Sequence, residues 1–385
     1  MVDADWKSRP VAFDCRHFLG DRPCLWHKRE GALCHCDHYE PVTERILIIK
    51  LDAIGDVLRT TCVLPPLAQA HPDAAIDWLT RPEALPLLEN NPYLSDVIAL
   101  GPDAFARLSA QPYDEVINLD PGKTSASLAK LASGTQKTGF VLNDRGHVTA
   151  TNSAAEMWLK MGLFDDLKKG NTRSYPDIMC EIMGLPRNGM RYVLELEQAE
   201  VDSARARLDE LGIAFDKPVI GLNTGAGDRW ALKKWREDGF VDLIDKIHED
   251  PGSDVQVVLL GGQRELERND RIAGRSKGPV FNAGFDPDIR RFAALVSLCD
   301  VTVCGDTLAL HLAIALGGRV VALFGPTSSA EIELFGSGRK IVPEMDCLVC
   351  YKAECDFVPN CMDLITSEMV KNAISAELAI ALGRG

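Results

Sequence analysis

The sequence is short of positive charge. Its 42 lysine and arginine residues stand against 56 aspartate and glutamate residues, which gives a net charge of −14 over 385 residues. Such an acidic chain has no overall field that would attract nucleic acid or an anionic membrane face. We therefore expect no nucleic-acid partner, and any anion that the protein binds must be held by a few local donors.

Long hydrophobic runs are also missing. The most apolar early run, residues 46–58, is interrupted by Lys50, Asp52 and Asp56 and is shorter than the roughly 20 apolar residues that a membrane span needs. The first ten residues are polar and lack the apolar centre of a secretory signal. We expect a cytoplasmic protein without a transmembrane segment. Peripheral membrane contact stays open, as does the oligomeric state.

From residue 45 onward, short apolar runs alternate with helical stretches, which predicts an α/β protein with parallel sheets. The expected strands are residues 45–51, 75–79, 97–100, 115–119, 138–141, 219–223, 255–260, 301–304 and 320–324. One helical stretch is expected over residues 57–70 and another over 366–382. We expect a Cys- and His-rich extension (1–44), a first αβ domain (45–190) and a second one (191–385). Facing edges of the two domains would form a cleft.

Three motifs follow expected strands, at the sheet edge where doubly wound proteins bind ligands. The first motif, Gly55-Asp56, places a carboxylate near the N-terminus of a helix. Asp56 is either a catalytic group or only the cap of that helix. Thr224 and Gly225 open a glycine-rich turn whose amides can approach an anion, with Lys233 or Lys234 in reach of a phosphate. The alternative for this second motif is a plain turn with solvated lysines.

The third motif comes directly after the strand expected over residues 301–304. Asp306 and Thr307 would open a helix, and His311 lies further along it. His311 is either a phosphate ligand or a buried histidine bonded to backbone. No Asp-x-Asp of the nucleotide-sugar type stands in a suitable loop, so the sequence does not call for a metal ion in a transfer step.

Together the three motifs resemble glycosyltransferase family 9, the ADP-heptose heptosyltransferases of bacterial surface polysaccharide and lipopolysaccharide biosynthesis, over residues 45–340. The resemblance implies a GT-B fold, in which two Rossmann-like, doubly wound domains face a central cleft. It also implies an inverting transfer of a heptose from ADP-heptose to a hydroxyl of a surface polysaccharide, a protein or a metabolite. Two alternatives are a GT-B enzyme using another nucleotide sugar and a non-catalytic, metal-containing nucleotide-binding protein.

The resemblance also assigns roles to individual residues. It implies that Asp56 is the catalytic base, which typically contributes about 10²–10⁴-fold to a rate. The implied nucleotide-sugar ligands are Thr224, Gly225, Lys233, Glu265, Asp306, Thr307, Leu308 and His311. The implied acceptor ligands are Asp120, Lys123 and Arg145. Leu308 stands where the family has glycine and Arg236 where it has proline, which leaves the donor sugar open.

Eight of the 12 cysteines form two clusters. In a reducing compartment they favour metal ligation over disulfides. The C-terminal set, Cys347, Cys350, Cys355 and Cys361, has the spacing of a site for zinc, a single iron or an iron–sulfur cluster. The N-terminal set, Cys15, Cys24, Cys34 and Cys36, is interleaved with four of the eight histidines.

Each cysteine set can hold its own metal, or cysteines from both ends can meet in one site. The expected role is structural, and unrelated free thiols are the alternative. A branch of the family that heptosylates autotransporter proteins is associated with a cysteine-bound iron, and this chain is similar to it in its C-terminal set. Cys62, Cys180, Cys299 and Cys304 are expected to be small core residues.

Overall fold

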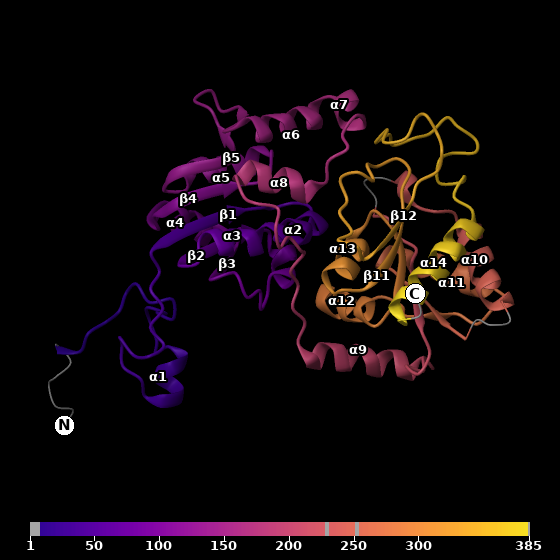
Figure 1. Cartoon of the computed structure of the whole chain (residues 1–385), viewed down its shortest axis with the longest axis horizontal. Helices are drawn as coiled ribbons and strands as arrows, with labels where there is room; N and C mark the ends of the chain where they lie inside the picture. The colour runs from indigo at the N-terminus through magenta and orange to yellow at the C-terminus, as the bar shows by residue number, and fades with distance from the viewer. Residues whose placement is uncertain (1–7, 228–230, 251–253, 384–385) are drawn as a thin grey trace.

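The computed structural model describes residues 8–227, 231–250 and 254–383. It has two αβ halves, each built around one six-stranded sheet. Figure 1 shows them side by side, the first half in indigo to magenta and the second in orange to yellow. The segment that carries α1 (Leu25–Glu30) hangs from the first half, on the side away from the second half (Figure 1).

The first sheet has the strand order β3-β2-β1-β4-β5-β6, and its neighbours are parallel except for the antiparallel pair β5 and β6. Its strands are β1 (Glu44–Ile49), β2 (Ala74–Thr80), β3 (Asp96–Ala99), β4 (Tyr113–Asn118), β5 (Gly134–Leu142) and β6 (Val148–Ala150). Residues 46–49 of β1 have no exposed surface, as expected of a central strand covered on both faces. The order reverses between β1 and β4, so this half presents its binding edge there.

The second sheet repeats the same topology with the order β12-β11-β10-β7-β8-β9, all neighbours being parallel. Its strands are β7 (Val219–Asn223), β8 (Gln256–Leu260), β9 (Phe281–Asn282), β10 (Val301–Gly305), β11 (Arg319–Leu323) and β12 (Gly338–Ile341). Here the order reverses between β7 and β10. The loops after β7 and β10, which carry the second and third motifs, therefore lie next to each other.

Helices cover both sheets. Those of the first half are α2 (Ile54–Thr60), η2 (Thr61–Val63), α3 (Leu64–Ala70), η3 (Pro82–Leu87), α4 (Pro102–Ala110), α5 (Lys123–Leu131), α6 (Ser153–Leu163), α7 (Asp165–Lys169) and α8 (Tyr175–Met183). Those of the second half are α9 (Gln198–Glu210), η4 (Ala231–Lys233), α10 (Glu237–Glu249), η5 (Gln263–Glu265), α11 (Leu266–Arg275), α12 (Ile289–Ser297), α13 (Leu308–Ala315) and α14 (Ser367–Ala381).

Two details differ from the expectation. The stretch over residues 57–70 is not one helix, because Pro65 and Pro66 begin a new helix, α3, after the 3₁₀ turn η2. The sequence analysis did not predict three short strands, β6, β9 and β12, each of which lies at the edge of its sheet. They are two to four residues long and contain no apolar run that would have marked them. The four single cysteines are all buried, as expected of core residues.

The two halves are in direct contact. Helix α2 of the first half packs against α13 of the second, and the Tyr175 amide donates to the Glu331 carbonyl at 2.8 Å. Arg290, at the start of α12, donates to the Pro86 carbonyl of the first half at 2.8 Å. Helix α14 packs on α10 and β11, so it belongs to the second half. Within the described residues, no helix combines the length and the apolar character needed to cross a membrane.

Candidate active site

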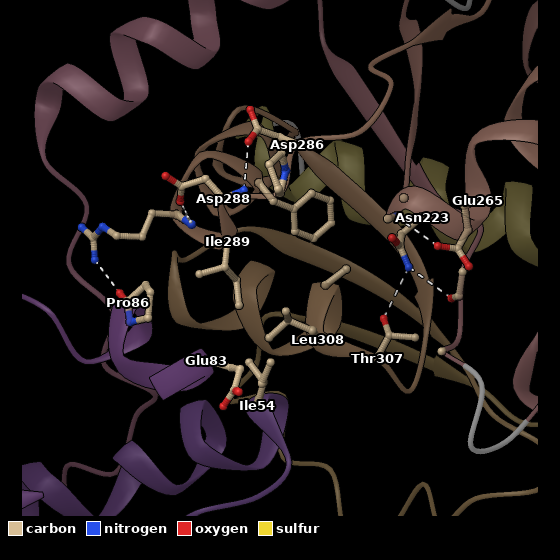
Figure 2. A pocket seen from close by; sticks show the side chains of 18 of the residues that line it. Ile54, Glu83, Pro86, Asn223, Glu265, Asp286, Asp288, Ile289, Thr307 and Leu308 are labelled. Atoms are coloured by element: carbon tan, nitrogen blue, oxygen red, sulfur yellow. Dashed lines mark hydrogen bonds between the residues drawn. The ribbon is translucent and has the colours of Figure 1, made fainter. Parts of the chain in front are cut away.

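A cleft of about 920 Å³ lies between the two halves, at the carboxyl edges of both sheets (Figure 2). The first half lines it with Ile54 at the start of α2 and with the η3 segment, which contributes Glu83 and Pro86. The second half lines it with the turns after β7, β8, β9 and β10. Figure 2 shows Ile54 facing Leu308 across this space. Four of the expected donor-site residues line this cleft, namely Gly225, Glu265, Thr307 and Leu308, whereas Asp56, Thr224, Lys233, Asp306 and His311 are not among its lining residues.

Asp56 occupies the first turn of α2, two residues after Ile54. Its carboxylate accepts the Ala53 amide at 3.2 Å and pairs with the Arg59 guanidinium at 2.8 Å. Burial by itself raises the pKa of Asp56, but the charges of Arg59 and Lys50 outweigh it and lower the pKa to about 2. Asp56 is therefore a carboxylate throughout the neutral range, with a side chain that is 37% exposed.

Arg59 is held in place by an aromatic ring. Its guanidinium lies 3.8 Å from the centre of the Tyr175 ring, and the Tyr175 hydroxyl is 2.6 Å from the Thr60 hydroxyl. Cation–π contact and burial fix the guanidinium beside Asp56. Tyr175 begins α8, far along the chain, so tertiary packing rather than local sequence sets this arrangement.

His311 of the second half lies directly under the Asp56 turn. A methyl group placed on Gly55 would come within 3.1 Å of the His311 ring, so glycine is what lets the two helices approach. Burial, and then the charge of Arg59, lower the pKa of His311 to about 4, so the ring is neutral near pH 7. Its Nδ1 is buried and has no hydrogen-bond partner among the described residues. The alternative that His311 is a buried histidine hydrogen-bonded to the backbone is therefore not supported at Nδ1.

Lys233 and Asp306 form an ion pair behind the cleft. The Lys233 ammonium is 2.7 Å from the Asp306 carboxylate and 3.1 Å from the Asp306 carbonyl oxygen. Burial raises the pKa of Asp306, but the Lys233 charge overrides it and lowers the pKa below its usual range. Thr307 and Leu308, next in the chain, line the cleft, whereas Lys233 and Asp306 lie just beneath its wall. Lys233 is thus held beside the loop that lines the site.

Glu265, labelled in Figure 2, lies on another wall of the cleft, and Gly225 lies against it. Glu265 accepts the Gly262 amide at 3.0 Å, and a methyl group on Gly225 would come within 2.6 Å of the Glu265 carboxyl carbon. Asn223 donates to the Thr307 hydroxyl at 3.4 Å, which ties the turn after β7 to the turn after β10. Thr224 is buried and donates to Asn269 at 2.6 Å, so its side chain supports this wall from behind.

The three expected acceptor ligands lie outside the cleft lining. Asp120 is buried and holds the Lys50 ammonium and the Leu51 amide, so it shapes the turn that leads to Asp56. Lys123 is exposed at the start of α5, and Arg145 is exposed in the turn between β5 and β6. None of the three lines the cleft. Their role in acceptor binding stays a prediction.

Several cleft residues were missed by the sequence analysis. They are Glu83, Pro86 and Glu89 in and after η3, and Asp286, Asp288 and Arg290 at the start of α12. Asp288 caps α12 through the Arg290 amide at 2.8 Å, and such a cap is a visible sequence signal. Arg290 also pairs with Glu200 at 2.5 Å, which links α9 to the cleft wall. The sequence contains no signal that the N-terminus of α12 faces η3.

The two cysteine sets lie far apart, in different parts of the fold, which excludes one shared site for residues of both ends (Figure 1). Cys15, Cys24, Cys34 and Cys36 line one cavity beside α1. Of the C-terminal set, Cys361 packs beside Gly325, where a methyl group would come within 2.6 Å of the Cys361 sulfur. Across the residues that the structure describes, no group of three or more His, Cys, Asp or Glu side chains is already arranged to hold a metal ion.

Comparison with known proteins agrees with this geometry. Residues 104–359, more than half of the chain, match the family model for glycosyltransferase family 9 (heptosyltransferase). Among curated proteins, the chain is 22% identical to lipopolysaccharide heptosyltransferase 2 of Escherichia coli strain K12 over 312 residues, which covers 74% of this chain and 83% of the relative.

Solved structures show the same fold. The structure of E. coli ADP-heptose LPS heptosyltransferase II matches with a TM-score of 0.66 at 20% identity, covering 87% of this chain and 99% of that one. The iron-containing dodecameric glycosyltransferase TibC from enterotoxigenic E. coli matches with a TM-score of 0.53 at 12% identity, covering 88% and 77%. The expected GT-B fold is therefore confirmed.

Proposed function

The chain belongs to glycosyltransferase family 9 and is a glycosyltransferase, and from this premise we propose that it transfers a heptose from ADP-heptose to a hydroxyl acceptor with inversion. The observation that carries the proposal is the placement of Asp56. Its turn contributes to the cleft wall from the first half and meets His311 and the Leu308 backbone of the second half through Gly55. The turn that carries the Asp56 carboxylate thus lies against the part of the second half that carries Leu308.

The proposed step is a single in-line displacement. Asp56 takes the proton of the acceptor hydroxyl, the acceptor oxygen bonds to the anomeric carbon, and the bond from that carbon to the diphosphate breaks. ADP leaves with the electron pair. Developing charge on ADP would be met by the N-terminus of α13, which begins at Leu308, and by Lys233 behind it.

Glu265 and Leu308 bear on which donor is bound. Glu265 lies on the second-half wall, where the ribose of ADP would rest, and Leu308 projects into the same cleft (Figure 2). A leucine in place of the family's glycine narrows the space next to the diphosphate. This one substitution favours a second candidate, a donor with another sugar or nucleotide. The acceptor is a lipopolysaccharide core sugar, a protein hydroxyl or a metabolite, and the proposed location is the cytoplasm.

The test replaces the proposed base. Asp56→Asn keeps the size of the side chain but removes its ability to take a proton, so we expect kcat to fall about 10²–10⁴-fold while ADP binding remains. The matched control is Asp96→Asn, which alters a carboxylate paired with Arg107 at 2.7 Å in the same half, outside the cleft lining. Sugar transfer and ADP release from ADP-, GDP- and UDP-sugars are measured by mass spectrometry. A wild-type rate in Asp56→Asn would overturn the proposal.

We also propose that Cys347, Cys350, Cys355 and Cys361 hold a structural zinc or iron ion, or an iron–sulfur cluster. Burial, and then the negative charges of Cys350, Cys347 and Cys355, raise the pKa of Cys361 to about 11. Their loop is bonded to the end of β11, where the Val349 amide donates to the Gly325 carbonyl at 3.1 Å. A metal there would stiffen the loop after β11 and is not needed for the transfer step.

A further inference from the structure

Residues 8–43, which we call the N-terminal knuckle, fold without a hydrophobic core. Ala12 is the only buried residue among them, and α1 buries none. Phe13 is 71% exposed and Leu33 is 54% exposed. A unit this small and this open cannot be stabilised by apolar burial and usually needs a disulfide or a metal ion.

The cysteines of the knuckle are placed to supply that link. Cys15, Cys24, Cys34 and Cys36 come from three separate stretches of chain and line one cavity of about 310 Å³. Cys24 begins α1, and its sulfur accepts the His27 amide at 3.5 Å. Between Cys34 and Cys36, His35 takes a left-handed backbone with a φ of 65°, which makes a tight turn with one thiol on each side.

Three of the four histidines around the cavity already have other partners. His27 Nδ1 is 2.9 Å from the Ala32 carbonyl oxygen, and His17 is 3.4 Å from Glu40. His38 is 3.1 Å from Glu30 and stacks on Trp26 with 3.7 Å between ring centres. Each of these contacts involves one ring nitrogen only, as it also does in histidines that bind a metal, so the four cysteines are taken as the ligand set because thiolates are preferred ligands of zinc.

We propose that Cys15, Cys24, Cys34 and Cys36 bind one zinc ion, which replaces the missing core of the knuckle. Four thiolates fill the tetrahedral positions of zinc and leave none for substrate, so the role is structural. Because the thiols are not already arranged around one point within the described residues, zinc binding would turn them into the cavity and release their protons. This proposal does not depend on the proposed function.

The knuckle is fastened to the first half by its own backbone and by one arginine. The Thr43 amide donates to the Asp73 carbonyl at 3.2 Å, and Arg16 donates to the Ala74 carbonyl at 3.0 Å, at the start of β2. This attachment lies at the amino ends of the parallel strands β1 and β2, the edge opposite the cleft. Loss of zinc is thus expected to loosen the knuckle and to leave the cleft intact.

The first experiment uses the wild-type full-length protein. It is purified with a reductant, stripped with a chelator and labelled with a thiol reagent with and without added Zn²⁺, and each cysteine is mapped by mass spectrometry. We expect Zn²⁺ to protect all four knuckle thiols, and trypsin to cut at Lys28 and Arg29 faster without it. Equal labelling with and without Zn²⁺, or pairing of these cysteines in disulfides, would overturn the proposal.

The second experiment separates the knuckle from the C-terminal set. Cys34→Ser with Cys36→Ser should lower the bound zinc by one ion per chain and remove one set of cobalt–thiolate absorption bands after Co²⁺ exchange. The matched control is His35→Asn, which removes the imidazole from the same turn, keeps a residue that tolerates the left-handed backbone, and should retain the ion. Unchanged zinc content in the double variant, or loss of zinc in the control, would contradict the ligand set.

Discussion

Arg59 offers a direct test of how the charge of Asp56 is controlled. Arg59→Met removes the guanidinium that pairs with Asp56 at 2.8 Å but keeps an extended apolar side chain against Tyr175. In the wild type, burial raises and the Arg59 and Lys50 charges lower the pKa of Asp56, from an ordinary 3.8 to about 2. Without its main counter-charge, the pKa of Asp56 should rise.

The sign of the pH effect follows. A base with a pKa of about 2 stays ionised at every pH where transfer is measured, so the wild type should show no acid limb from Asp56 down to about pH 4. In Arg59→Met the rate should fall as the pH drops through the raised pKa. The assay is kcat/KM for sugar transfer between pH 4 and 8.

Two controls bound this prediction. Arg59→Lys keeps a positive charge and should keep most of the flat profile, whereas Arg107→Met breaks a carboxylate–guanidinium pair at 2.7 Å outside the cleft and should leave the profile unchanged. An active Arg59→Met enzyme whose profile matches the wild type down to pH 4 would refute the argument that Arg59 sets the ionisation of Asp56.

Two further predictions concern the contact between the halves. Gly55→Ala puts a methyl group within 3.1 Å of the His311 ring, so it should lower the free energy of unfolding by about 1–3 kcal/mol and reduce transfer, as measured by denaturant unfolding and kcat. A Gly101→Ala control, where a methyl group meets nothing within 4 Å, should leave transfer unchanged. His311 has a pKa of about 4 when folded against 6.5 unfolded, so the unfolded chain binds more protons between these values. Stability should fall by up to about 3 kcal/mol as the pH drops from 6.5 to 4, and His311→Gln should flatten that slope; an equal slope in both proteins would contradict the buried, neutral ring.

The family and the fold were readable from the sequence because each rests on short-range pattern. Apolar runs such as residues 46–49 and 219–223 are buried strands in the structure, since a central parallel strand is covered on both faces and shows no alternation. The motifs at Gly55-Asp56 and Asp306-Thr307 were found because they follow such strands directly. The edge strands β9 and β12 were missed because they are two and four residues long, which is too short to show a hydrophobic periodicity.

The cleft wall formed by η3 and the start of α12 could not be predicted from the sequence. Pro86 and Arg290 are joined by a hydrogen bond at 2.8 Å but are separated by 204 positions in the chain. Asp120 was expected near the acceptor because the family resemblance implies that role, and its burial against Lys50 became visible only when β1 and β4 were seen to be neighbours.

Strand burial, helix starts and ligand spacing are local properties of the chain, so the two doubly wound halves, the order of the three motifs and the two separate groups of cysteines could be predicted from the amino-acid sequence. The charge states of Asp56 and His311, and the contact of Arg59 with the Tyr175 ring, could be seen only in the folded structure. These charge states and contacts depend on residues that are far apart along the chain but close in space. Electrostatic and packing energies are set by the distance between atoms and not by separation in sequence.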